Sequence, residues 1–79
     1  MTEKVGILRT QPSGRWALCR PGHPPVEITP GYPFRVEVDG KLRVTRMEYR
    51  HFDRGGGEYY SVDGYPLRDG VLAALDEHD

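Results

Sequence analysis

The stretch from Phe34 to Tyr49, FRVEVDGKLRVTRMEY, decides the fold. Its first half alternates polar residues with the apolar side chains of Phe34, Val36 and Val38, which is the period of a half-buried strand. Asp39-Gly40 follows, a dipeptide suited to the two positive φ angles of a type I′ turn. We therefore expect Lys41 to Tyr49 to return as the second strand of a hairpin.

The return strand carries a change of phase. Leu42 and Val44 are expected to point inward at its start, whereas Met47 and Tyr49 are expected to do so further along. A strand with a strict period of two changes phase through a bulge. The sequence therefore predicts a bulge or a sharp bend at Thr45-Arg46, and such bends let a small sheet curl into a barrel.

Turn signals recur at short intervals on both sides of this hairpin, so the segments between them suit strands better than helices. Pro12-Ser13-Gly14 is expected to join a strand containing Val5, Ile7 and Leu8 to a second strand from Arg15 to Arg20. Residues 21–33 hold five prolines, which predicts an irregular loop with a short edge strand at Val26 and Ile28.

Two further segments complete the prediction. Glu58 to Val62 is expected to be a strand that follows a glycine-rich loop. From Val71 a short closing strand is expected, with a helical turn capped by Asp69 as the alternative. Five or six short antiparallel strands predict an all-β fold, a small SH3-like barrel or roll. Residues 1–79 form a single domain in this prediction, with a core from about 4 to 75.

Composition limits the function. The chain has 79 residues and a formal net charge of −1, so no bulk charge draws it to nucleic acid or to an anionic membrane. The longest apolar run, Val71 to Leu75, is far shorter than a membrane span. Cys19 is the single cysteine, which excludes an internal disulfide and favours a reducing compartment. We therefore expect a cytoplasmic protein without a membrane partner.

Several blocks resemble a family of short bacterial proteins of unknown function, many of them encoded on plasmids, phages and conjugative elements. The blocks are Arg15-Trp16-Ala17-Leu18, Pro33 to Val38, Val44 to Tyr49, Glu58 to Val62 and Leu67 to Gly70. The resemblance covers about residues 14 to 75. It implies an all-β fold and a mobile-element origin, and it brings no known activity or catalytic residues.

The chemistry-bearing residues do not form an enzyme motif. Cys19, His23, His51 and His78 lack the paired spacing of a structural zinc site, so neither a metal nor another cofactor is expected. Glu37 and Glu48 are expected to face each other across the hairpin as ordinary exposed strand residues. No nucleophile motif surrounds Cys19 or a serine. We therefore expect a protein that acts by binding and not by catalysis.

Arginines interleaved with aromatic residues give the clearest binding signal. With a bulge at 45–46, the arginines of the return strand would share one outer face, close to tyrosines of this strand and the next. The candidate binding residues are Arg43, Arg46, Tyr49, Arg50, Arg54 and Tyr59.

Arginine suits an acidic protein surface as well as phosphate, and acidic residues lie among these arginines. The segment from Lys4 to Arg54 contains ten Lys and Arg residues and five Asp and Glu residues. From Gly55 onward there is one basic residue and there are six acidic ones. We therefore expect an interaction module, an accessory protein of a mobile element that binds a protein partner. The alternative is a nucleic-acid-binding barrel. The predicted state is a monomer or weak dimer, and a tight dimer through an open barrel edge is a further alternative.

Overall fold

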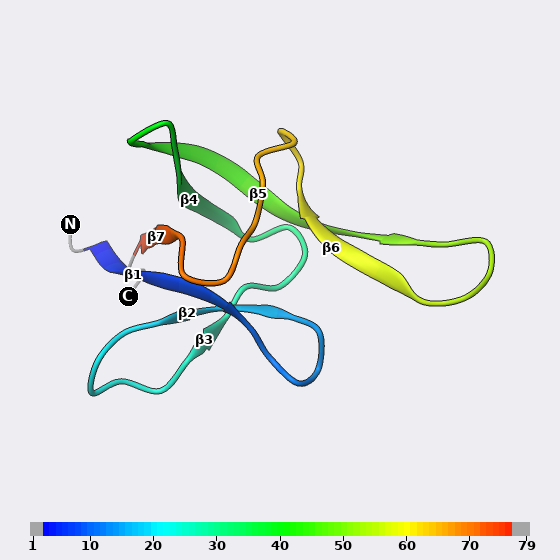
Figure 1. Ribbon diagram of the computed structural model, residues 1–79, viewed down its shortest axis with the longest axis horizontal. Helices are drawn as coiled ribbons and strands as arrows, with labels where there is room; N and C mark the ends of the chain where they lie inside the picture. The colour runs from blue at the N-terminus through cyan, green and yellow to red at the C-terminus, as the bar shows by residue number, and fades with distance from the viewer. Residues whose placement is uncertain (1–2, 77–79) are drawn as a thin grey trace.

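The computed structural model describes residues 3–76, which form seven strands and no helix (Figure 1). The strands are β1 (Glu3–Thr10), β2 (Trp16–Cys19), β3 (Val26–Glu27), β4 (Pro33–Val38), β5 (Lys41–His51), β6 (Gly57–Ser61) and β7 (Leu72–Asp76). Every pairing between them is antiparallel. Nothing in this described range is a helix long and apolar enough to cross a membrane.

The β4–β5 hairpin has the predicted turn. Val38 pairs with Lys41, so the connection consists of two residues, Asp39 and Gly40. Their φ angles are +53° and +81°, as a type I′ turn requires. Asp39 is the one residue other than glycine with a positive φ in the described chain, which explains why a short polar side chain stands there.

The predicted bulge at Thr45-Arg46 is wrong. The register of β5 is constant along β4 and again along β6, and no extra residue interrupts either ladder. Thr45 and Met47 are buried on one face, whereas Val44 is 68% exposed on the other, so Val44 does not point inward. The strand instead changes partner: Arg46 pairs with β4 and Met47 pairs with β6. The apparent phase shift in the sequence arises because Leu42 and Val44 are apolar side chains on the outer, even-numbered face.

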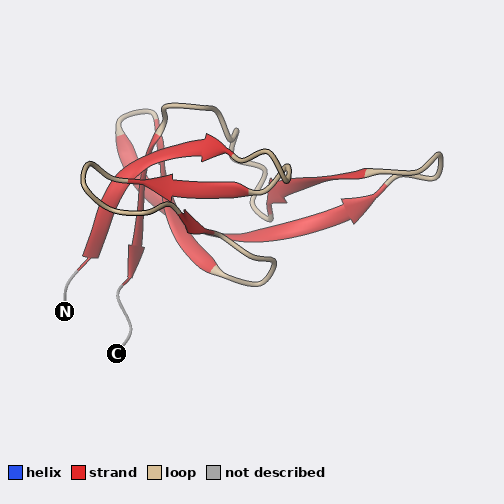
Figure 2. Ribbon diagram, turned by 90° about the horizontal axis from the view of Figure 1, so that it is seen from below, coloured by secondary structure: helices blue, strands red, loops and turns tan. Residues whose placement is uncertain are grey.

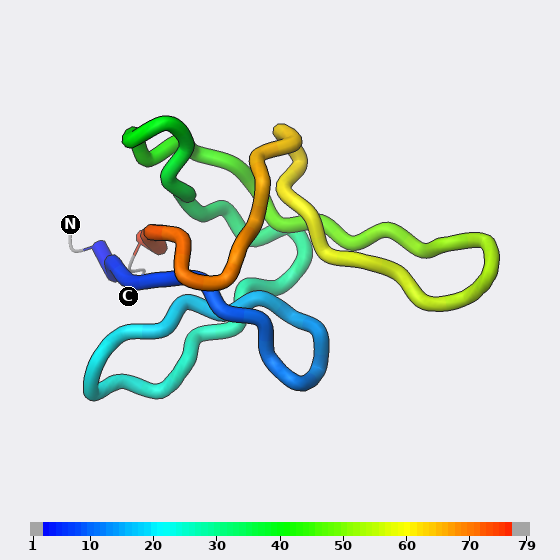
Figure 3. Tube along the Cα trace, viewed as in Figure 1, coloured from blue at the N-terminus to red at the C-terminus, as the bar shows by residue number. Residues whose placement is uncertain are grey.

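The sheet curls into a half-barrel with the strand order β3-β2-β1-β7-β4-β5-β6. Figure 2 shows the curl, and Figure 3 shows the β5–β6 hairpin reaching away from the other strands along the long axis of the molecule. The predicted small all-β, barrel-like class is confirmed, with seven strands where five or six were expected. The closing strand is confirmed as β7, and residues 77–79 lie outside the described range.

The core fills the concave side of this curled sheet. Its apolar side chains come from five of the seven strands and from the residue after β3, and burying them is the main favourable contribution to folding. The buried cluster consists of Leu8, Leu18, Ile28, Phe34, Val36, Met47, Ala73 and Leu75. Because β7 lies between β1 and β4, both of its alanines, Ala73 and Ala74, are fully buried.

Gly6 permits a close approach between β1 and the end of β2. A Cβ atom at this position would collide with the carbonyl oxygen of Cys19 and lie 2.8 Å from the Cγ atom of Arg20. Main-chain atoms cannot move aside as the end of a flexible side chain can. The glycine is therefore a steric requirement of this ladder.

Replacing this glycine tests the close approach. Gly6→Ala is expected to lower the free energy of unfolding by about 1–3 kcal/mol, the cost typical of overpacking. Urea denaturation followed by Trp16 fluorescence measures the loss. Val5→Ala is the matched control, since Val5 is 47% exposed and its loss should be smaller. A Gly6→Ala protein as stable as the wild type would contradict this account.

Asp69 joins the turn before β7 to the end of β1. Its carboxylate accepts hydrogen bonds from the Thr10 main-chain N–H at 2.7 Å and from the Thr10 hydroxyl at 2.9 Å. These bonds, first the main-chain one and then the hydroxyl one, hold the pKa of Asp69 below its ordinary value, and the nearby Arg9 charge acts in the same direction. The predicted role of Asp69 as a helix cap is replaced by this contact between strands.

The lowered pKa makes part of the stability depend on pH. Folding favours the charged carboxylate, so the stabilisation is fully present above the unfolded-state pKa of about 4 and is lost as the pH falls through the folded-state pKa. We expect Asp69→Asn to be less stable than the wild type at pH 7, and the difference to shrink on acidification. Urea denaturation from neutral pH downward measures it. A difference that stays constant with pH would contradict the assignment.

Candidate functional site

The β5–β6 ribbon presents two faces with different chemistry. Tyr49 pairs with Tyr59 and Arg50 pairs with Glu58, and side chains that are paired across an antiparallel ladder share a face. The first pair lies on the face that continues from buried Met47. The second pair lies on the opposite face together with Tyr60.

The first face is a cluster of aromatic rings. The centroids of Tyr49 and Tyr59 are 4.6 Å apart with a tilt of 57°, and His51 meets the Tyr49 ring edge-on at 4.9 Å. Gly57 lies beneath this cluster, where a Cβ atom would collide with the Tyr49 ring and with the carbonyl oxygen of Arg50. Gly57 thus gives Tyr49 the room to lie flat on the ribbon, the arrangement known from glycines covered by aromatic residues.

The second face is a network of paired charges. The Arg50 guanidinium lies 4.1 Å from the centre of the Tyr60 ring, and its Nε atom is 3.0 Å from a Glu58 carboxylate oxygen. Four residues earlier in β5, Arg46 donates to Glu48 at 2.8 Å. Both arginines of this face therefore already have a carboxylate partner within the chain.

The six predicted site residues do not form one surface. Arg46 and Arg50 share a face, but Arg43 lies on the other face of β5 because the strand has no bulge. Arg54 lies beyond both strands, in the loop at the tip of the hairpin. The predicted common arginine face is therefore wrong, whereas Tyr49 and Tyr59 do come together.

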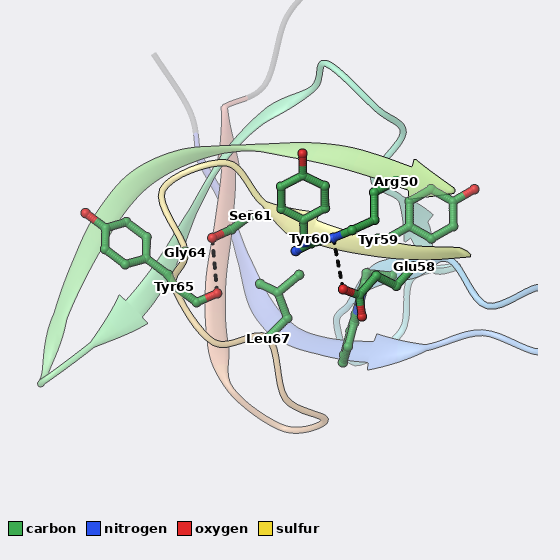
Figure 4. Close-up of a pocket in the computed structure, with 9 residues that line it drawn as sticks. Arg50, Glu58, Tyr59, Tyr60, Ser61, Gly64, Tyr65 and Leu67 are labelled. Atoms are coloured by element: carbon green, nitrogen blue, oxygen red, sulfur yellow. Dashed lines mark hydrogen bonds and ion pairs between the residues drawn. The ribbon is translucent and has the colours of Figure 1, made fainter. Parts of the chain in front are cut away.

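Two depressions flank β6, with volumes of about 340 and 370 Å³. Trp16, Glu58 and Tyr59 line both of them, so the two adjoin along the strand. The first continues over residues of β5, of β6 and of the segment after β6, as Figure 4 shows: Arg50, Tyr60, Ser61, Gly64, Tyr65 and Leu67. The second extends to Ser13, Gly14, Tyr49 and Gly57. We call the two together the β6 groove.

Local contacts fix the walls of the groove. The buried Ser61 hydroxyl donates to the Tyr65 carbonyl at 3.1 Å, and the Gly64 N–H donates to the Ser61 carbonyl at 2.9 Å. These bonds turn the chain back after β6 and bring Tyr65 and Leu67 to the groove. On the other side, the β1–β2 turn brings Trp16 to it.

Reasoning from the sequence missed the far wall of this groove. Trp16, Tyr65 and Leu67 were not among the candidates, because they are distant from Tyr59 in the sequence. One signal was available: Asp63-Gly64, a turn directly after the predicted strand, sends the chain back along it.

Within the described residues, the carboxylates and the potential metal ligands do not form a catalytic pair or a metal site. Glu37 pairs with Leu42, and Glu48 pairs with Tyr60 on the other side of β5, so the predicted placement of the two glutamates opposite each other is wrong. Between residues 3 and 76, no group of three or more His, Cys, Asp or Glu side chains is placed to hold a metal ion. His78 lies outside this range.

Comparisons with known proteins identify no relative: no family model, no curated protein and no solved structure matches the chain.

The contacts of Arg50 are expected to make a small contribution to the free energy of unfolding. We expect Arg50→Ala to lower the free energy of unfolding by no more than about 2 kcal/mol, since an exposed ion pair contributes about 0.2–1 kcal/mol and an exposed cation–π contact about 0.5–1 kcal/mol. Circular dichroism and urea denaturation measure it, with Arg54→Ala as a control that should leave stability unchanged. Unfolding of the Arg50→Ala protein would mean that Arg50 is a structural residue.

Proposed function

We propose that the protein is a non-enzymatic interaction module that binds a segment of a protein partner in the β6 groove. The carrying observation is the lining of the groove: half-buried Trp16, Tyr49, Tyr59, Tyr60 and Tyr65 surround two adjoining depressions. Tyrosine and tryptophan supply large contact areas at a low entropic cost, and they are enriched in the centres of protein interfaces.

The pairing of charges favours a protein over nucleic acid. Binding to phosphate requires cations whose charge is available, and it weakens steeply with salt. Arg46 and Arg50 are held by Glu48 and Glu58, and the aromatic pair Tyr49–Tyr59 lies on the opposite face. An oligonucleotide would therefore meet only the Tyr60 ring beside these paired arginines, and not the Tyr49–Tyr59 pair. We keep nucleic-acid binding as the alternative that the experiment below tests.

Our proposals on cellular location, fold relation and genetic origin rest mainly on the sequence. A single cysteine favours a reducing compartment, so we place the protein in the cytoplasm. We also propose a relation of the fold to SH3-like barrels. An accessory role on a mobile element follows from the resemblance of five short sequence blocks, and these proposals stay independent of the groove.

Selection from a random dodecapeptide library displayed on phage tests the groove. The immobilised full chain is expected to enrich peptides whose synthetic forms shift the amide signals of residues 57–67 in NMR titrations. Tyr59 lines both depressions, so Tyr59→Ala should weaken these peptides at least tenfold. Phe52→Ala is the matched control, an exposed aromatic residue outside the groove, and it should bind normally.

Titration with single-stranded and duplex oligonucleotides at roughly 50 and 200 mM salt covers the alternative. We expect no salt-sensitive shift along β5 and β6. Oligonucleotide shifts that fade at the higher salt, together with a library that yields no binder, would replace the protein partner by nucleic acid.

A further inference from the structure

Along the groove, strand β6 has main-chain N–H and C=O groups that do not bond to β5. In an antiparallel ladder, residues alternate between those that bond to the neighbouring strand and those that point away from it. Val62 N–H donates to Arg46 and Phe52 N–H donates to Gly56, so the bonded positions of this ladder are the even-numbered ones. The N–H and C=O groups of Gly57, Tyr59 and Ser61 therefore point to the open edge.

Most of these outward groups have no partner among the described residues. The Ser61 carbonyl accepts from Gly64 N–H at 2.9 Å. No strand other than β5 pairs with β6 within residues 3–76. The N–H and C=O groups of Tyr59 and the C=O of Gly57 thus remain available, and they are spaced as one side of a β-ladder, whereas Ser61 is buried.

The two edge strands of the sheet, β3 and β6, differ in how well they are protected against pairing with a further strand. At one end of the sheet, β3 has only two residues, and Pro24 and Pro25 immediately before it lack an N–H. Short strands and prolines are the common protection of an edge against a further strand. At the other end, β6 has five residues, contains neither proline nor lysine, and includes two tyrosines that favour strands.

The side chains around this edge indicate which segment would fit. A strand laid along β6 would place its alternate side chains beside Tyr59 and Trp16 on one face and beside Glu58 and Tyr60 on the other. The Glu58 side chain is half exposed, and Arg50 holds one of its carboxylate oxygens. A lysine or arginine opposite Glu58 would donate a hydrogen bond to its second carboxylate oxygen, and apolar side chains would fill the depressions.

We propose that the partner segment binds as an eighth strand along β6, with a basic side chain opposite Glu58 and apolar side chains at the positions that enter the groove. This inference rests on the proposed function, because it names how the partner lies in the same groove. Main-chain hydrogen bonds would supply affinity, and the pockets for alternate side chains would supply specificity.

N-methylation of the selected peptides tests the strand. Each synthetic peptide is methylated at one main-chain nitrogen at a time, and its affinity for the full-length wild-type chain is measured. We expect a two-residue alternation: methyl groups on nitrogens that face β6 weaken binding about tenfold each, and those on intervening nitrogens have little effect. Affinities that do not alternate would overturn the strand while leaving the groove as the binding site.

Amide hydrogen exchange supplies a second measurement on the same complex. Tyr60 N–H belongs to the existing ladder, so its exchange should change little when peptide is added. The outward N–H of Tyr59 should become protected at least tenfold. Protection that rises with protein concentration in the absence of peptide would mean that a second copy of the chain occupies the edge, and it would overturn the partner proposed here.

Glu58→Gln tests the basic position. Peptides with lysine or arginine opposite residue 58 should bind this variant about three- to tenfold more weakly. Glu48→Gln is the matched control, a glutamate on the same face whose residue is not part of the groove. Equal affinity for wild type and Glu58→Gln would overturn the charge assignment. If the library yields no peptide at all, the proposed function itself fails.

Discussion

The main-chain ladders on the two sides of β7 hold the molecule together. β7 pairs with β1 through five residues and with β4 through two, so it joins the β1–β2–β3 part of the sheet to the β4–β5–β6 part. Its position requires small side chains, because Ala73 and Ala74 are buried and Ala73 lies opposite Gly6. The curl that brings Trp16 to β6 depends on this junction, and the groove therefore depends on it too.

The fold could be predicted to the extent that it is encoded locally. The Asp39-Gly40 turn, the alternation in β4 and the proline-rich edge are short-range signals, and each has its predicted form. The Ala-rich segment 73–75 was ambiguous because alanine favours helices, and two flanking ladders decide for the strand. The supposed bulge failed because Val44 is an exposed apolar side chain, and a single strand's pattern does not distinguish it from a core residue.

The site was predicted only in part. Tyr49 and Tyr59 were expected together because two adjacent strands carry them, and their rings are in contact. The common arginine face depended on the bulge and fell with it, and the pairing of Arg50 with Glu58 required the exact register of β5 and β6. Trp16 and Tyr65 reach the groove through turns far apart in the sequence, so no window of sequence contains it.

The outer part of the β5–β6 hairpin extends beyond the core, and this has a consequence for its dynamics. Past Met47 its side chains are half-buried or exposed, and the contacts of Tyr49 and Arg50 support the main-chain ladder between β5 and β6 there. Segments with few buried apolar contacts open at a smaller free energy than the molecule as a whole. We therefore expect the outer hairpin to open at a smaller free energy than the core, and any molecule seated along β6 would shift that local equilibrium toward the closed form.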